Sequence, residues 1–143
     1  MAFSPEQIAE WLARGFEVNA DGCLTKYTGT DPHVVLPNSV RTLGYGAFRR
    51  CPSLTSVVLP EGLVDISNYA FEECGRLQSV VLSNSVRTLG KGAFSRCRSL
   101  TSVVLPEGLV DISNHAFEVC ERLQSVVFPN SVRTLGYGAF QRC

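Results

Sequence analysis

The chain has 143 residues, of which 45% are hydrophobic and 18% are charged, and its 13 basic residues balance its 13 acidic residues. This length and composition are ordinary for a soluble globular domain with a hydrophobic core. The net charge of zero argues against a protein that binds nucleic acid or an anionic membrane, because such proteins need a clustered excess of lysine and arginine. No apolar run approaches the roughly 20 residues of a membrane span, and no secretory signal is recognisable at the N-terminus.

Residues 1–35 do not follow the pattern of the rest of the chain, and we expect them to form a cap. The pair Ser4-Pro5 is typical of a helix N-terminus, and Gly15 is typical of a helix end. Two strand-like segments, residues 16–18 and 23–27, follow on either side of a polar turn. The sequence therefore predicts a helix and a hairpin that cover the first coil of the remaining chain.

From residue 36 onward a block of 23 residues recurs, and three of its columns keep their residue types with one exception, Phe128 in place of leucine. The columns are Leu36, Leu59, Leu82, Leu105 and Phe128; Ala47-Phe48, Ala70-Phe71, Ala93-Phe94, Ala116-Phe117 and Ala139-Phe140; and Cys51, Cys74, Cys97, Cys120 and Cys143. Such self-similarity is typical of a solenoid, in which each unit buries its apolar face against its neighbours. We therefore expect one structural domain in which the cap precedes an array, residues 36–143, of five coils, the last of them incomplete.

Each coil is expected to contain one β-strand and, on its far side, a short helical segment. The alternation within residues 54–59 places Val57 in the core and Val58 outside. A turn at residues 60–62 then leads the chain to a short helical or 3₁₀ turn around Phe71. Parallel stacking of such coils predicts an α/β solenoid.

The order of apolar residues within each coil is specific. Residues 59–80 follow L-P-x-x-L-x-x-I-x-x-x-A-F-x-x-C-x-x-L-x-x-V, a pattern that resembles the BspA-like leucine-rich repeat family. Residues 24–37 also resemble the hairpin that precedes such arrays, so the likeness covers about residues 16–143. It implies a right-handed leucine-rich solenoid with a parallel sheet on the concave face and helical or 3₁₀ turns on the convex face. It further implies a protein-binding module, with adhesion and a cell-surface or secreted location as expectations, although no signal peptide is recognisable.

The cysteines indicate neither disulfides nor a metal site. Five of the six occupy one column, so they should lie about one strand spacing (~4.8 Å) apart with parallel side chains, an arrangement unsuited to disulfides. We expect them to be buried thiols that behave as small apolar residues, with Cys23, outside the column, as a free thiol. Close pairs such as C-x-x-C, which zinc sites use, are absent. We expect no cofactor.

Two kinds of coil alternate along the chain. Residues 36–58 differ from residues 82–104 at four positions, and residues 59–81 differ from residues 105–127 at three, whereas the first two coils share only nine. The true unit is therefore 46 residues, as either a recent tandem duplication or an engineered consensus repeat would give. The coils carry alternating net charges of +3, −3, +4 and −3, so neighbours should attract each other and fix the order of stacking.

The outward-facing columns of the predicted sheet form the candidate protein-binding face. They contain His33, Ser56, Ser79, Ser102 and Ser125, and Val35, Val58, Val81, Val104 and Val127. A contiguous exposed apolar strip often marks an interaction site, but β-branched residues also simply favour strands, and both interpretations stay open. His33 and Ser56 could be drawn as a catalytic triad with Asp31, but nothing supplies an oxyanion hole or a strained nucleophile turn. We expect no enzymatic activity.

The outer turns are a second candidate surface. The differences between duplicated coils cluster near six residues there: Tyr45, Tyr69, Lys91, His115, Glu118 and Tyr137. Exposed tyrosines are suited to binding another protein. The alternative explanation of these differences is sequence drift at solvent-exposed positions that have no function. We expect His115 and Glu118 to be a solvated pair and not a metal site.

The C-terminal end of the array gives the alternative function. The sequence stops at Cys143, before the closing strand of the fifth coil, and strand 126–128 is expected to present a bare edge. Either the chain is a piece of a longer array or another chain covers this end. Both interpretations predict self-association through Val126, Phe128 and Phe140, so the alternative function is a structural module that forms a homo-oligomer.

Overall fold

The computed structural model describes residues 3–143 and begins with a short cap. Helix α1 (Pro5–Ala13) starts at Ser4, whose hydroxyl accepts a hydrogen bond from the backbone N of Gln7 at 3.1 Å. The helix ends before Gly15, which has a φ of +92°, a conformation that glycine adopts without strain. Strands β1 (Phe16–Val18) and β2 (Cys23–Tyr27) then form an antiparallel hairpin, as the sequence predicted.

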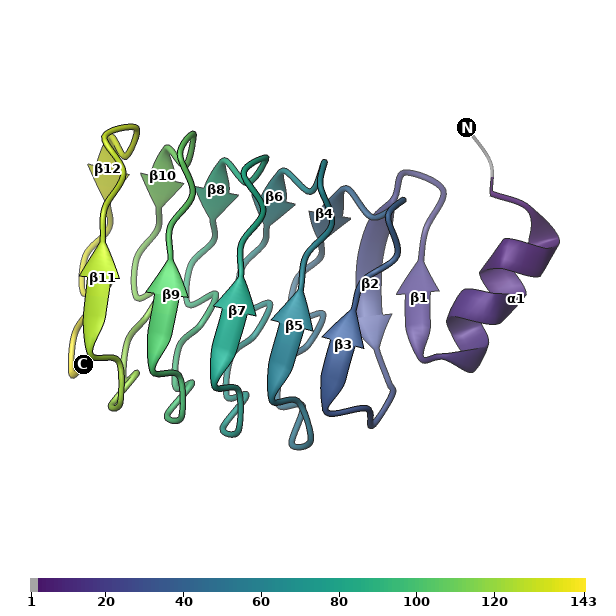
Figure 1. Cartoon of the computed structure of the whole chain (residues 1–143), viewed down its shortest axis with the longest axis horizontal. Helices are drawn as coiled ribbons and strands as arrows, with labels where there is room; N and C mark the ends of the chain where they lie inside the picture. Colours follow the sequence, from purple (N-terminus) through teal and green to yellow (C-terminus); the bar gives the residue numbers. More distant parts are fainter. Residues whose placement is uncertain (1–2) are drawn as a thin grey trace.

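The rest of the chain winds through successive coils that each contribute a three-residue and a two-residue strand. The three-residue strands are β3 (His33–Val35), β5 (Ser56–Val58), β7 (Ser79–Val81), β9 (Ser102–Val104) and β11 (Ser125–Val127). The two-residue strands are β4 (Thr42–Leu43), β6 (Asp65–Ile66), β8 (Thr88–Leu89), β10 (Asp111–Ile112) and β12 (Thr134–Leu135). Figure 1 shows these coils side by side in one row that runs from α1 to β12.

The strands form two sheets, one on each side of the solenoid. The five-stranded sheet, here called the Ser-Val sheet, has the order β11-β9-β7-β5-β3 and is parallel throughout. The seven-stranded sheet, here called the groove sheet, has the order β1-β2-β4-β6-β8-β10-β12 and is parallel except for the hairpin. Equivalent residues of neighbouring coils pair directly, for example Val58 with Val81. The predicted solenoid with parallel strands is confirmed.

A column of aromatic rings runs through the core. Phe48, Phe71, Phe94 and Phe117 are fully buried. Successive rings in this column lie 5.0 to 5.2 Å apart and are tilted by only 4° to 7°, which is within the range of favourable aromatic contacts. Tyr27 of the cap continues the column, with its ring 5.1 Å from that of Phe48. Each coil therefore packs on its immediate neighbours, and the hairpin covers the first one.

The structure corrects the prediction for the far side of each coil in two respects. A second sheet lies there, which the sequence analysis did not predict, and the segments around the phenylalanines are not the helical or 3₁₀ turns that it did predict. These segments are non-helical turns, since their backbone amides alternate between two kinds of partner. The N of Glu72 donates to Tyr69 O within the turn, at 3.1 Å, whereas the N of Glu73 donates across to Ser95 O of the next coil, at 2.9 Å. Glu73 also has a φ of 59°. A continuous 3₁₀ helix requires every amide to bond within the turn and φ to remain negative.

The two kinds of coil fit together through glycines. A Cβ added to Gly90 would lie 2.6 Å from the backbone N of Asn68 in the preceding coil, and one added to Gly92 would lie 2.6 Å from the ring of Tyr69. The side-chain oxygen of Asn68 accepts a hydrogen bond from the backbone N of Lys91, between the two glycines, at 2.8 Å. The G-x-G segment of one coil thus leaves room for the S-N-Y segment of the preceding one, so the two kinds of coil are complementary where they meet.

The opposite charges of neighbouring coils meet in ion pairs. Arg50 and Glu73 are 2.9 Å apart, and Arg98 and Glu121 are 3.5 Å apart. Both pairs join residues 23 positions apart, as the alternation of charge predicts. They are largely exposed, so each contributes only about 0–1 kcal/mol and acts on register more than on stability.

Candidate binding surfaces

The solvent side of the Ser-Val sheet carries the predicted protein-binding residues, and we call it the Ser-Val face. Its valines are 42% to 78% exposed: Val35, Val58, Val81, Val104 and Val127. The serine column lies beside them, two residues earlier in each strand: Ser56, Ser79, Ser102 and Ser125, with His33 at its start. The valines between the two columns point inward, and those of β3, β5, β7 and β9 are buried. Period-two alternation therefore predicted the exposure of this face correctly.

The face is nearly free of charge, and its one histidine is not part of a catalytic triad with Asp31. Only His33 of its two columns is titratable, and its Nδ1 lies 2.8 Å from the hydroxyl of Ser56. The carboxylate of Asp31 instead accepts a hydrogen bond from the backbone N of His33, at 3.4 Å, so it does not orient the imidazole as a triad requires. The remaining neighbour of the imidazole is the Thr55 hydroxyl, at 3.3 Å. What the face offers is a strip of apolar side chains beside hydroxyl groups.

The thiols of the cysteine column are free, and the prediction that they are buried holds for its three inner members, whereas Cys51 is half-buried and Cys143, in the last coil, is exposed. Cys74, Cys97 and Cys120 are buried, and each donates a hydrogen bond to a phenylalanine carbonyl of the preceding coil, at 3.0 to 3.2 Å. Burial raises the pKa of the Cys97 thiol well above its ordinary value and that of Cys120 to about 12. A thiol is a nucleophile or metal ligand only as the thiolate, so these groups are structural.

The outer turns bring aromatic residues together in two pairs. The rings of Tyr45 and Tyr69 meet edge to face at 5.5 Å, and those of His115 and Tyr137 do so at 5.6 Å. His115 Nδ1 also lies 2.9 Å from a carboxylate oxygen of Glu118. Within residues 3–143 no group of three His, Cys, Asp or Glu side chains could hold a metal ion. The turns thus present an aromatic and polar edge.

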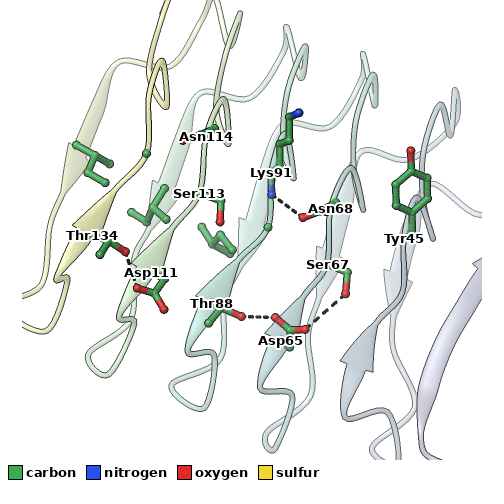
Figure 2. A pocket seen from close by; sticks show the side chains of 15 residues that line it. Tyr45, Asp65, Ser67, Asn68, Thr88, Lys91, Asp111, Ser113, Asn114 and Thr134 are labelled. Atoms are coloured by element: carbon green, nitrogen blue, oxygen red, sulfur yellow. Dashed lines mark hydrogen bonds between the residues drawn. The ribbon is translucent and has the colours of Figure 1, made fainter.

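A groove of about 840 Å³ lies on the groove sheet and extends from Tyr45 of the first coil to the fifth coil. Two rows of polar residues border it (Figure 2). One row contains Asp65, Thr88, Asp111 and Thr134, and the other contains Tyr45, Asn68, Lys91 and Asn114. Ser67 and Ser113 lie between the rows. The sequence analysis missed this groove, although its signal was present as a column in which Thr and Asp alternate every 23 residues.

The lining side chains are held by hydrogen bonds between coils. The hydroxyl of Thr88 donates to Asp65, and the hydroxyl of Thr134 donates to Asp111. The side-chain oxygen of Asn114 accepts a hydrogen bond from the backbone N of Tyr137 at 2.8 Å. The side-chain oxygen of Asn68, 46 residues earlier, accepts the equivalent bond from Lys91. These contacts fix the carboxylates and amides in a regular row, so the groove is pre-formed.

The residues predicted to mediate self-association, Val126, Phe128 and Phe140, lie at the end of the array, in strand β11 and the residues that follow it. Phe128 is 45% exposed, whereas its equivalents in the inner coils are buried. Val126 is half-buried and pairs with Val103 of β9. Phe140 stacks on Phe117 at 5.1 Å and meets Phe128 edge to face at 5.5 Å. Phe140 therefore closes the aromatic column of the core.

Among residues 3–143, no helix meets the length and hydropathy required to span a membrane.

Comparison with solved structures finds other leucine-rich repeat proteins. A leucine-rich cell surface protein from Faecalibacterium prausnitzii is 35% identical, with a TM-score of 0.83, over 90% of this chain and 35% of that one. The pneumococcal vaccine antigen PcpA is 25% identical, with a TM-score of 0.79, over 82% of this chain and 30% of that one. The chain thus spans about a third of the length of these two proteins. A leucine-rich repeat protein from T. pallidum is 23% identical, with a TM-score of 0.59, over 96% of this chain and 86% of that one. At this level of identity the likeness shows a common fold and nothing further.

The repeat itself defines the family. No curated protein matches the chain. The sequence model described as the BspA type leucine-rich repeat region matches residues 26–143 in six copies, and these residues contain the stacked coils and the end of strand β2. The chain therefore belongs to the BspA-type leucine-rich repeat family.

Proposed function

We propose that this chain is a protein-binding module that presents the Ser-Val face to a partner protein, and that it acts in adhesion at a microbial cell surface. One observation carries the proposal: five valines, 42% to 78% exposed, stand in one unbroken row across paired strands. A row of apolar side chains without interleaved charge is typical of an interaction site. The surface location is supported by the likeness to the cell surface protein of F. prausnitzii.

The face indicates the chemistry of the partner. Apart from His33, its two columns contain only serines and valines. An approaching surface rich in Lys, Arg, Asp or Glu would lose hydration without gaining a charged partner. The partner should therefore present a flat, uncharged surface whose apolar groups meet the valines and whose polar groups meet the serine hydroxyls.

The double variant Val81→Lys with Val104→Lys tests this function. It should lower the affinity for a captured partner at least tenfold, because two ammonium groups would have to be desolvated at the centre of the contact. The chain would be immobilised, a partner captured from host-cell or microbial surface extracts, and the affinity for the purified partner measured by surface plasmon resonance. Both valines are more than half exposed, so the stability of the fold should change by no more than about 0.5 kcal/mol.

Val64→Lys is the matched control, because Val64 is also an exposed valine, at 43%, but lies outside the Ser-Val face. The control should bind the partner like the parent chain. Equal loss in the control and the double variant, or full binding by the double variant, would contradict the assignment of this face.

A second candidate function is assembly through the fifth coil, which is favoured by its exposed apolar side chains. Phe128 is 45% exposed and Leu135 55% exposed, whereas the equivalent residues of the inner coils are at most 7% exposed. Strands β11 and β12 each pair on one side only, and an unpaired strand edge is a template for another chain. A second copy that covers this coil would bury both side chains and pair both edges.

The double variant Phe128→Lys with Leu135→Lys tests this assembly. Sedimentation velocity should show concentration-dependent dimers of the 143-residue chain and only monomers of the variant, because each lysine would place a charge in the contact. Partner capture through the Ser-Val face should be unchanged. A parent chain that stays monomeric at every concentration, or a variant that still dimerises, would rule out assembly through the fifth coil.

A further inference from the structure

We propose that the groove on the groove sheet binds an uncharged, linear oligosaccharide. The groove lies on the opposite side of the solenoid from the Ser-Val face, so the proposal does not depend on protein binding. Its volume of about 840 Å³ lies within the range of small-molecule sites, about 300–1,000 Å³. Most of the side chains that border it carry hydroxyl, amide or carboxylate groups, which are the groups that bind sugar hydroxyls.

The carboxylates have unused capacity to accept hydrogen bonds. An ionised carboxylate offers about four acceptor sites. Asp111 accepts one side-chain hydrogen bond, from Thr134. Asp65 accepts one from Thr88 and a long one of 3.5 Å from Ser67. Both residues line the groove and are half-buried, and the threonine contacts hold their carboxylates in place, so their remaining acceptor sites are available to ligand hydroxyl groups.

The amides supply donors opposite these acceptors. The oxygens of Asn68 and Asn114 each accept a backbone hydrogen bond at 2.8 Å, which fixes the orientation of the amide planes. Within residues 3–143 no acceptor bonds to their NH₂ groups, so four N–H donors remain for a ligand. Figure 2 shows the asparagines and the aspartates on opposite sides of the groove. A sugar ring between the two rows can donate to one side and accept from the other.

The charges of the groove disfavour anionic linear ligands. Asp65 and Asp111 would repel sulfated or sialylated glycans and nucleic acid. Lys91, which lies on the opposite side between them along the groove and has no ion-pair partner within residues 3–143, offsets one of the two carboxylate charges and so reduces the attraction for a basic peptide. An uncharged ligand meets no such repulsion. Tyr45, 64% exposed at one end of the groove, offers an aromatic face on which the apolar side of a sugar ring can pack.

The regular spacing of the lining residues indicates a chain of sugars. Neighbouring strands of a sheet lie about 4.8 Å apart, so Asp65 and Asp111, two coils apart, present equivalent carboxylates about 10 Å apart. The two asparagines repeat with the same step because they occupy one column. Equivalent groups at a regular interval can bind equivalent hydroxyls that recur at the same interval along a linear chain of sugars.

The proposal is tested with the whole chain on a glycan array that contains neutral, sulfated and sialylated oligosaccharides, followed by calorimetric titration with cellohexaose, chitohexaose and mannohexaose. We expect binding to at least one neutral linear glycan and none to the anionic ones. Asp65→Asn and Asp111→Asn should each weaken that binding about tenfold, because hydrogen bonds to an ionised acceptor are roughly twice as strong as those to a neutral acceptor. Asparagine can still accept the threonine hydroxyl, so circular dichroism and thermal unfolding should match the parent chain.

Asp21→Asn is the matched control, because Asp21 is an exposed aspartate of the cap that does not line the groove, and it should leave glycan binding unchanged. Three outcomes would overturn the proposal: no binding to any neutral glycan, binding restricted to anionic glycans, or neutral-glycan binding that survives both groove substitutions. The Val81→Lys, Val104→Lys variant should bind glycan normally. Failure of this proposal is therefore distinguishable from failure of protein binding at the Ser-Val face.

Discussion

Replacing Phe94 by alanine is expected to lower the free energy of unfolding by about 3–5 kcal/mol, the range measured for large buried aromatic residues. Phe94 is fully buried, and its ring lies 5.0 Å from that of Phe71 and 5.2 Å from that of Phe117, with tilts of 4° and 5°. The substitution removes both stacking contacts and leaves a cavity between two rigid coils. Urea denaturation followed by circular dichroism would measure the change.

The same substitution at the last ring of the column is the control. Phe140 is only half-buried and has one stacked neighbour, Phe117 at 5.1 Å. Each coil of a solenoid is stabilised by its immediate neighbours. Phe140→Ala should therefore lower the free energy of unfolding by less than half the amount expected for Phe94→Ala. Equal costs would mean that stability is not distributed by nearest-neighbour contacts, which would contradict the stacked architecture.

The sequence predicted this column because a solenoid makes its contacts at one fixed separation in the chain. Once the 23-residue period is known, Phe71 must lie beside Phe48 and Phe94, and no long-range topology has to be guessed. The cap was predicted for a different reason, since Ser4 and Gly15 are local signals for the start and end of a helix. Exposure of the Ser-Val face followed from strict alternation along strands such as Ser56–Val58.

The groove sheet could not be predicted in the same way. A strand of two residues, such as Thr42–Leu43, is too short to show alternation. The turns around the phenylalanines contain Tyr69 and His115 at φ of 60°. Histidine is enriched in the left-handed region but tyrosine is not, so the residue type at this position does not predict the backbone conformation. The groove is lined by residues of several coils, so it exists only once the coils are stacked. Its aspartates and asparagines therefore resembled an ordinary solvated surface.

Replacing Gly90 by alanine is expected to destabilise the protein by about 1–3 kcal/mol, the usual cost of overpacking. The added Cβ would lie 2.6 Å from the backbone N of Asn68 and 2.6 Å from the carbonyl carbon of Ser67. These are backbone atoms of the preceding coil, so they cannot move aside without displacing that coil and its hydrogen bonds. Thermal and urea denaturation of the variant would measure the loss.

Gly75→Ala is the matched control, because a Cβ there would meet nothing within 4 Å. Alanine at this exposed position should leave stability unchanged or raise it by about 0.4–1 kcal/mol, since the unfolded chain loses freedom. A clear loss at Gly90 beside no loss at Gly75 would show that the two kinds of coil alternate because only a glycine-containing coil fits next to the S-N-Y segment. Equal tolerance at both positions would mean that the 46-residue unit records a duplication without a requirement of packing.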